Sequence, residues 1–439
     1  MNSEVSNINS IGFSFILVAS ALIIFLPRRY AIIPMICAAC YITLGQVVNV
    51  AGLNFTAMRI LVLAGWVRVV ARGEASSIRI NVIDKLVILF AIASVVTYTL
   101  LWQTSEALVN RLGYIYNVIG IYFLFRFLVR DLDDVIIAYR TLAIIIVPLA
   151  LTMLIEKTTG RNLFSVFGGV PEFTMVREGK LRCQGPFGHP ILAGTFGATL
   201  VPLFVGLWFR GGRNRRVAVV GLLAATAIAL TPASNGPVLA YVFALVGLIL
   251  WHFRSHLRVI RWGTVIALVG LHLVMKAPVW YLINRIGEIM GGGGGFHRSE
   301  LINQAISHFG EWWFLGTTYT AHWMPYFLPS EPNMVDITNQ FIFVGVYGGI
   351  LPLTLFIVVI ALCFRVVGRA LRAATQESMA TQMIIWSLGA ALFAHVVSFL
   401  SIAYFDQMVV AWYLVLAMIS AVANPSKMAA EPIVQPQKN

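Results

Sequence analysis

Charged side chains are scarce in this chain, and those able to do chemistry gather in two polar stretches. The first stretch, 156–187, is mainly cationic, with Lys157, Arg161, Arg177, Lys180 and Arg182. The second, 276–338, holds Arg298 together with carboxylates and histidines: Glu288, Glu300, Glu311, Glu331 and Asp336, and His297, His308 and His322. Guanidinium groups bind phosphate oxygens through paired hydrogen bonds. Arginines from two stretches would therefore suit a phosphate-bearing ligand.

Arg182 and Arg298 are the main candidates for binding a diphosphate, with Arg177 and Lys180 beside the first. A polyprenyl diphosphate at the headgroup level of a membrane would explain their presence. Its departure in a glycosyl transfer builds negative charge, which guanidinium groups stabilise. Arg298, expected near a helix N-terminus, would add the favourable end of the helix dipole. The alternative for each arginine is a lipid headgroup contact or a surface ion pair.

Inverting glycosyl transfer also needs a base to take the proton of the acceptor hydroxyl. The candidates are His322 and Asp336, followed by His297, His308 and His189. Each histidine has a structural alternative, because histidines near tryptophans often serve packing. The aromatic residues from Trp312 to Trp323 would stack on sugars or anchor the segment at the membrane interface, and anchoring is favoured.

The second stretch has its own local pattern. The run Gly291 to Gly295 predicts a flexible joint, because glycine has no preferred backbone conformation. Leu301, Ile302, Ala305, Ile306 and Phe309 follow at the spacing of one helical face. We expect a short interfacial helix here that carries half of an active site. A solvated loop with an interfacial anchor is the alternative.

The composition is that of an integral membrane protein. Of 439 residues, 59% are hydrophobic and 11% charged, and the mean hydropathy is +0.84, whereas soluble proteins carry about 25% charged residues. About 13 apolar runs approach the length of a spanning helix. They are 11–26, 31–50, 55–71, 82–102, 107–128, 135–155, 188–209, 216–232, 236–253, 259–279, 339–363, 382–401 and 405–423. The fold class is thus all-α and polytopic, with about 12–13 transmembrane helices.

Basic residues fall in every second loop between these runs, which is the positive-inside pattern. It places the N-terminus and both polar stretches outside and the C-terminus inside. The net charge of +13 therefore does not indicate nucleic acid. The expected organisation is transmembrane helices (1–155), a first long loop (156–187), further spans (188–279), a large loop with an interfacial helix (280–338), the last spans (339–424) and a disordered cytoplasmic tail (425–439). No cleavable signal peptide is expected.

Ionisable residues are rare inside the runs. Arg59, Arg111, Arg140 and Asp406 lie near predicted ends, where they would reach the interface. An ion-coupled transporter would carry acidic or histidine residues deep in its spans. This pattern counts against an ion-coupled transporter. A transport pathway lined by neutral polar groups remains an alternative.

Several segments resemble one membrane-protein superfamily. The segment from Arg182 through Gly185, His189 and Pro190 to Ala198 resembles the element of the O-antigen ligase / Wzy-type polysaccharide polymerase superfamily in which an outer-loop arginine precedes a His-Pro pair and a span. Further resemblances are Thr231 to Gly236, with Asn235 in place of the family's arginine, His297-Arg298-Ser299 with Leu301, Trp312 to Gly316, and Asp336 to Phe341 with Asn339, followed by Gly345 and Gly348-Gly349. Together they cover about residues 180–365.

The resemblance implies a C-type membrane glycosyltransferase with two long periplasmic loops in the bacterial inner membrane, its active site facing the periplasm. Its donor would be an undecaprenyl-diphosphate-linked oligosaccharide held by Arg182 and Arg298, with no cofactor, metal or nucleotide sugar. Family ligases commonly place a histidine before the matching asparagine, where this chain has Thr338. That departure favours a polymerase of capsule, exopolysaccharide or O-antigen repeats over a ligase acting on lipid A-core or protein.

The resemblance also implies partners. A polymerase of this kind would work beside membrane lipid, a chain-length regulator and a flippase. The rival from another class is that the chain is itself a transporter or flippase for lipid-linked oligosaccharide, with Arg59, Arg111 and Arg140 as the only cations to offer it.

Overall fold

The computed structural model describes residues 8–50, 53–289, 294–327 and 333–423, and most of them are helical. The helices are α1 Ser10–Phe25, α2 Ile33–Tyr41, α3 Ala57–Ala71, α4 Val82–Trp102, α5 Ser105–Leu128, α6 Leu132–Thr159, α7 Pro190–Trp208, α8 Gly212–Leu230, α9 Asn235–Ile249, α10 Leu257–Val274, α11 Leu282–Ile289, α12 Gly294–Ser307, α13 Phe309–Trp312, α14 Gln340–Gly348, α15 Ile350–Ala373, α16 Met379–Ser398 and α17 Gln407–Ala421. Two antiparallel hairpins pair β1 Val47–Val50 with β2 Leu53–Thr56 and β3 Met175–Arg177 with β4 Lys180–Arg182.

Seven helical stretches of the described residues are long and apolar enough to cross a membrane. They are α4, α5, α6, α7, the kinked stretch formed by α9 and α10, α15 and α16. The helices α1 and α17 are apolar but shorter. This confirms an all-α polytopic membrane protein. The count of 12–13 spans stays a prediction.

Two expected spans take a different form. The run 31–50 becomes the nine-residue α2 and then a turn, in which Gln46 donates a hydrogen bond to the Phe167 carbonyl (2.6 Å). The run 339–363 is divided between α14 and α15 at Gly349, which has a φ of +76°. A Cβ at Gly349 would lie 2.1 Å from the Phe314 carbonyl oxygen, so the break follows from a close backbone approach.

The large polar stretch contains the expected short helix. Leu301 and Ala305 are buried on one face of α12, whereas Ile306 is exposed. The predicted glycine joint lies partly outside the described residues, and Gly294 and Gly295 are helical, since they open α12. The predicted disordered tail, 425–439, lies wholly outside them.

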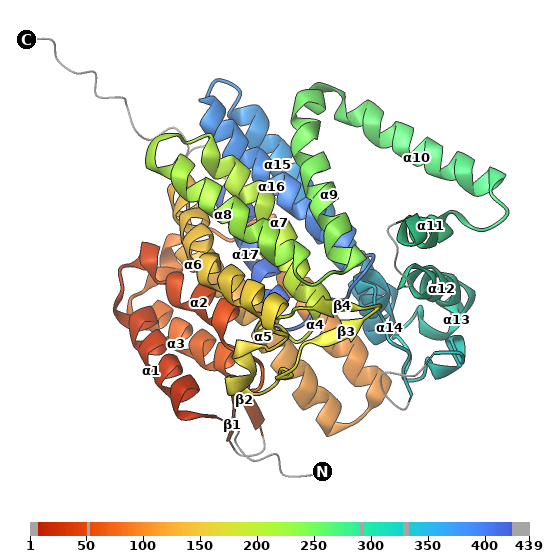
Figure 1. The fold of residues 1–439 in the computed structure, drawn as a ribbon, viewed down its shortest axis with the longest axis horizontal. Helices are drawn as coiled ribbons and strands as arrows, with labels where there is room; N and C mark the ends of the chain where they lie inside the picture. The colour runs from red at the N-terminus through yellow and green to blue at the C-terminus, as the bar shows by residue number, and fades with distance from the viewer. Residues whose placement is uncertain (1–7, 51–52, 290–293, 328–332, 424–439) are drawn as a thin grey trace, which may run out of the picture.

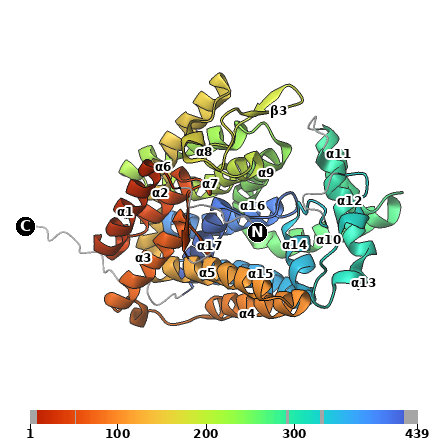
Figure 2. The same cartoon turned by 90° about the horizontal axis from the view of Figure 1, so that it is seen from below.

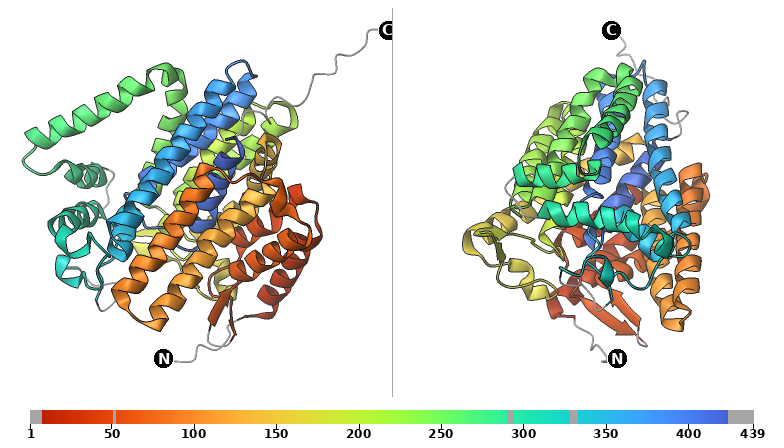
Figure 3. Two further views of the ribbon diagram at one scale, coloured as in Figure 1. Left: turned by 180° about the vertical axis from the view of Figure 1, so that it is seen from behind. Right: turned by 90° about the vertical axis from the view of Figure 1, so that its right-hand side faces the viewer.

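The helix α7 forms the centre of the bundle. It packs against α8, α9 and α16, and it is buried along nearly its whole length. Small residues allow this close packing: a Cβ at Gly197 would lie 2.6 Å from the Ala225 carbonyl oxygen of α8. Figure 1 shows α7 beside α8, α9 and α16, and Figure 3 shows the bundle from two further sides. The N-terminus of α7 is thereby fixed in position.

The segment from α10 to α13 lies beside the bundle. Figure 1 shows α10 leaving the end of α9 and reaching α11–α13, and Figure 2 shows α11–α13 along one flank. The chain bends at Phe253, whose backbone angles (φ −106°, ψ 17°) are not helical. No residue of α10 is buried by the rest of the chain. Such an apolar helix would be costly in water but would be covered by lipid in a bilayer.

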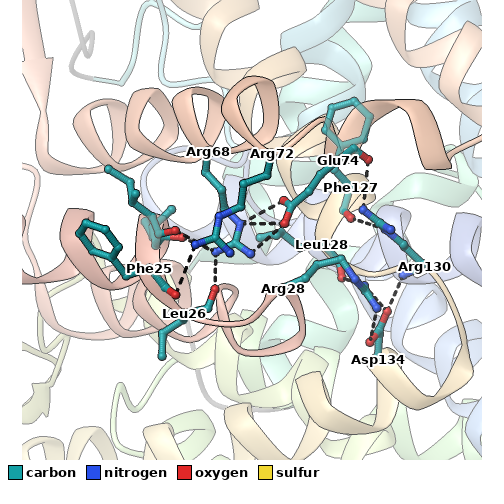
Figure 4. A network of polar contacts seen from close by, with 12 residues as sticks. Phe25, Leu26, Arg28, Arg68, Arg72, Glu74, Phe127, Leu128, Arg130 and Asp134 are labelled. Carbon is teal, nitrogen blue, oxygen red and sulfur yellow. Dashed lines mark hydrogen bonds and ion pairs between the residues drawn. The ribbon is translucent and has the colours of Figure 1, made fainter.

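Arginines of the predicted cytoplasmic loops form a compact polar network (Figure 4). Arg68 is buried and binds both carboxylate oxygens of Glu74. Its guanidinium also donates to the Ile23 and Leu26 carbonyls, each at 2.6 Å, at the end of α1. These carbonyls have no partner within their own helix. Arg68 therefore joins α1 to α3.

Candidate functional site

The β3–β4 hairpin presents three cations on one face. Arg177 pairs with Lys180, and Met175 pairs with Arg182. Cross-strand partners and residues two apart share a face of a hairpin, so Arg177, Lys180 and Arg182 lie on the same side. The two turn residues, Glu178 (φ 53°) and Gly179 (φ 71°), have the left-handed conformation that two-residue hairpins require.

Hydrogen bonds from the end of α6 hold the hairpin in place. The Glu156 carboxylate accepts from the backbone N–H groups of Gln184 (3.1 Å) and Gly185 (2.9 Å) and from the Thr174 hydroxyl (3.1 Å). Lys157 donates to the Leu181 carbonyl at 2.6 Å. Gly185 has a φ of +55°, a conformation that favours glycine. These contacts attach the loop backbone to a spanning helix.

All four predicted diphosphate-binding residues line one pocket. Its empty volume, including the part open to solvent, is about 520 Å³. The lining residues are Arg177, Glu178, Lys180, Arg182, Ile191, Ala233, Ser234, Asn235, Gly294 and Arg298. The lining thus carries four cationic side chains and one carboxylate. We call this the basic pocket.

The two central arginines of the basic pocket are bound by neutral groups. Arg182 donates to the Ser234 hydroxyl (2.9 Å), and Arg298 donates to the Ser401 (3.1 Å) and Gly294 (3.3 Å) carbonyls. No ion pair involves either arginine among the described residues. Burial, followed by repulsion from Arg177 and Arg182, lowers the pKa of Arg298 to about 10. The pocket therefore has excess positive charge.

Helix N-termini add to this potential. The basic pocket is lined by Ser234 and Asn235 at the start of α9 and by Gly294 at the start of α12. The unbonded N–H groups of a first helical turn attract anions. The Ser234 side chain makes no capping bond within α9. Arginines and helix N-termini together attract anions.

Two of the motif residues prove to be helix caps. The His189 Nδ1 accepts from the Ile191 N–H (3.1 Å), and Pro190 follows as the first residue of α7. The Asn339 side chain accepts from the N–H groups of Phe341 (2.9 Å) and Ile342 (3.2 Å) and caps α14. Burial, then Arg182, Arg298 and Arg177, lower the pKa of His189 to about 4. His189 is therefore neutral at pH 7, with its Nδ1 lone pair already used.

The two leading base candidates lie in different places. Asp336 is exposed and close enough to Arg298 and His297 to act on both electrostatically. His322 does not line the basic pocket. Its Nε2 lies 3.2 Å from Glu311, and its ring stacks on Tyr319 at 5.0 Å. The structure therefore brings Asp336 near Arg298 and leaves His322 outside the basic pocket.

The sequence analysis placed Asp406 at the membrane interface. The structure adds its carboxylate to the candidates for the base. It precedes α17 with a φ of 57° and a ψ of −144°, a conformation that side chains rarely adopt. Its Oδ2 accepts from the Gly188 N–H at 2.7 Å, next to His189. Burial raises the pKa of Asp406 to about 7, although the N–H groups of Gly188 and Gln407 oppose the shift. Strain and a shifted pKa together mark candidate functional residues.

Asp406 also lines a larger cavity, with an empty volume of about 1780 Å³ including open solvent. Besides Asp406 its wall includes Tyr98, Trp102, Asn110, Arg111, Tyr114, Asn117, Thr318, Asn333, Gln340, Tyr347, Tyr404 and Tyr413. Aromatic and amide side chains of this kind stack on sugar rings and bind hydroxyl groups. We call this the aromatic cavity.

Arg111 of α5 carries the positive charge of the aromatic cavity. It is 8% exposed and lies over the Tyr98 ring at 3.7 Å from the centroid. Its Nε has no hydrogen-bond partner, and no ion pair involves it in the described part of the chain. A buried cation without a counter-ion in a membrane protein indicates a functional site.

Comparison with known protein families gives no match for this chain, and comparison with curated proteins gives none either. The resemblance to O-antigen ligases and Wzy-type polymerases therefore rests on the motifs alone.

Proposed function

We propose that the chain is a polysaccharide polymerase, a membrane glycosyltransferase that uses an undecaprenyl-diphosphate-linked glycan as donor and the next lipid-linked repeat unit as acceptor. The observation that carries the proposal is the basic pocket. Arg177, Lys180, Arg182 and Arg298 come from two distant loops and meet at two helix N-termini. The positive-inside pattern supports an outward-facing pocket, which in a bacterial inner membrane would lie on the periplasmic face.

In the proposed reaction the acceptor hydroxyl oxygen forms a bond to the anomeric carbon of the donor. The bond from that carbon to the diphosphate oxygen breaks, and the lipid diphosphate keeps its electron pair. Arg182 and Arg298 stabilise the charge that develops there. The acceptor proton passes to a carboxylate, for which we assign Asp406, because its pKa of about 7 is suited to a base at neutral pH. Asp336 is the second candidate, whereas His322 lies apart from the basic pocket and is given no part in the reaction.

The aromatic cavity is the proposed site of the acceptor glycan. Asp406 belongs to its wall, and the same carboxylate binds Gly188 beside His189. Burial, Arg182 and Arg298 all act on the His189 ring. Asp406 thus stands where an acceptor in the cavity would meet a donor in the basic pocket. A ligase would share the donor site and differ in the acceptor.

The flippase alternative receives little support from its three cations. Arg59 is bound by the Asn117 side chain (3.1 Å) and the Asn54 carbonyl (2.7 Å). Arg140 is bound by the Asn214 side chain at 2.5 Å. Arg111 alone of the three lines the aromatic cavity.

Cells that lack the protein test the proposal. A polymerase defect leaves single lipid-linked repeat units on the outer face of the inner membrane, accessible to a glycosidase added to spheroplasts. A flippase defect leaves the same units on the inner face, protected until the membrane is opened. Accumulation on the inner face would contradict the proposal.

A further inference from the structure

We propose that His308, Glu311 and His322 form a zinc-binding site in the large polar loop, separate from the glycosyl-transfer site. One ligand atom from each side chain lies within 4.8 Å of the other two. Two histidines and a glutamate form a known zinc ligand set, with water in the fourth position. His308 and Glu311 lie three residues apart at α13, and His322 comes from the short 3-10 helix η6 (Ala321–Trp323).

Neighbouring groups leave the ligand atoms available. The His308 Nδ1 lies 2.9 Å from the Gln304 carbonyl oxygen. This bond requires Nδ1 to donate, so the lone pair is on Nε2. Zinc-bound histidines commonly use their second nitrogen in this way. Trp323 Nε1 donates to Glu311 Oε2 at 3.0 Å. The His322 Nε2 donates to Glu311 Oε1 at 3.2 Å, and the ion would take the place of this proton. The indole therefore orients the carboxylate.

Ring stacking holds both imidazoles. His308 stacks on Trp323 with 5.5 Å between centroids and 21° between planes. His322 stacks on Tyr319 at 5.0 Å and 10°. The two imidazole rings are 5.1 Å apart and nearly perpendicular. Because their planes are already held, the rings lose little conformational freedom when an ion binds.

The remaining adjustment is small. Ligands about 2.1 Å from a tetrahedral ion are about 3.4 Å from one another. The Glu311 and His322 side chains are 40% and 37% exposed, so they are free to move inward by about 1 Å to reach this spacing. The ion would join α13 to η6. Thr318, which lies between these elements, belongs to the wall of the aromatic cavity. Zinc would therefore stabilise the loop at this cavity.

Zinc binding to the full-length protein tests the inference directly. The protein would be purified in detergent through a tag without histidine, stripped with a chelator and titrated with Zn²⁺. We expect one ion per chain. His308→Ala and His322→Ala should each weaken binding at least tenfold. His252→Ala, at an exposed histidine of the distant 3-10 helix Leu250–His256, should bind zinc like the wild type.

Trp323→Phe provides a check that does not remove a ligand. It keeps an aromatic ring under His308 but removes the N–H that orients Glu311, together with part of the buried indole, so we expect binding to weaken about tenfold. Zinc binding unchanged in both histidine variants would overturn the site, as would a wild-type protein that retains no zinc after gel filtration. Neither outcome depends on whether the protein joins sugars.

Discussion

At the scale of single residues, alanine variants of the arginines in the basic pocket test whether these side chains bind the donor or support the fold. Arg182 and Arg298 are held by hydroxyl and carbonyl oxygens and have no carboxylate partner among the described residues. Replacing either with alanine should lower polymer formation by about 10²-fold or more, because a charge-stabilising donor is lost. The variants should accumulate in the membrane like the wild type.

Arg161 provides the matched control for these variants. It lies in the same loop, 65% exposed, within 3.9 Å of Glu172, and it does not line the basic pocket. Arg161→Ala should keep wild-type polymer yield in the same cells. Wild-type polymer yield from both Arg182→Ala and Arg298→Ala would contradict the donor-site assignment.

Asp406 should give the reaction its pH dependence. Burial raises its pKa to about 7, so the basic form is present above this pH and is lost as the pH falls through it. The rate should decline below pH 7 in the wild type. Asp406→Asn should lose most activity at every pH. A wild-type rate that is flat between pH 5 and pH 8, measured with the lipid-linked substrate, would exclude Asp406 as the base.

The same pKa predicts a change in stability. A carboxyl group whose folded pKa is raised stabilises the fold fully only below its ordinary pKa of about 4, and this stability is lost as the pH rises from there through about 7. An asparagine carries no charge at any pH. Asp406→Asn should therefore raise the melting temperature relative to the wild type most at pH 8 and less at pH 5. A lower melting temperature at pH 8 would show that the carboxylate serves the fold.

At the scale of elements, the hairpin depends on a carboxylate of α6. Glu156 accepts from Gln184, Gly185 and Thr174. Glu156→Ala would leave two backbone N–H groups of the loop unpaired, at about 1–3 kcal/mol each. The β3–β4 hairpin should then be cut faster by trypsin at its basic residues. Glu172→Ala, at an exposed site, should be cut like the wild type. Equal rates for both variants would contradict this anchoring role.

The sequence predicts the limits of a helix well where an apolar run is isolated. It predicts them less well where contacts with distant residues determine where the helix ends. The limits of α4 and α5 agree with the expected runs to within two residues. The break at Gly349 depends on the Phe314 backbone passing close by, which no local pattern reveals. The run 31–50 is mostly apolar, so hydropathy alone does not show that Gln46 binds the distant Phe167 carbonyl.

The candidate site shows the same limit. The composition of the two loops predicted the cations of the basic pocket, because basic residues are unusual on the outer side of a membrane protein. Asp406 was placed at an interface because it lies near the end of the predicted span 405–423. Its raised pKa comes from burial beside Gly188, which lies 218 residues away in the chain. A lone acidic residue before the last span was the only signal.

At the scale of the whole molecule, the positive-inside pattern predicts the orientation. The basic pocket should face outward, and the network around Arg68 should face the cytoplasm (Figure 4). A cysteine at exposed Val176 should react with a membrane-impermeant maleimide in intact spheroplasts. A cysteine at exposed Arg213 should react only after lysis. Of the native cysteines, Cys40, Cys183 and Cys363 are buried and Cys37 is half-buried, so the labelling is compared with that of the protein without an added cysteine. The reverse labelling pattern would put the basic pocket in the cytoplasm and contradict the proposed donor site.

The most direct test of the central claim uses the purified protein in detergent with a lipid-diphosphate-linked repeat unit and no other enzyme. A polymerase should produce a ladder of lipid-linked oligomers, and the ladder should disappear in Arg298→Ala. Label that passes only to added lipid A-core, with no ladder, would identify a ligase and contradict polymerisation. No product with either acceptor would contradict glycosyl transfer by this protein alone.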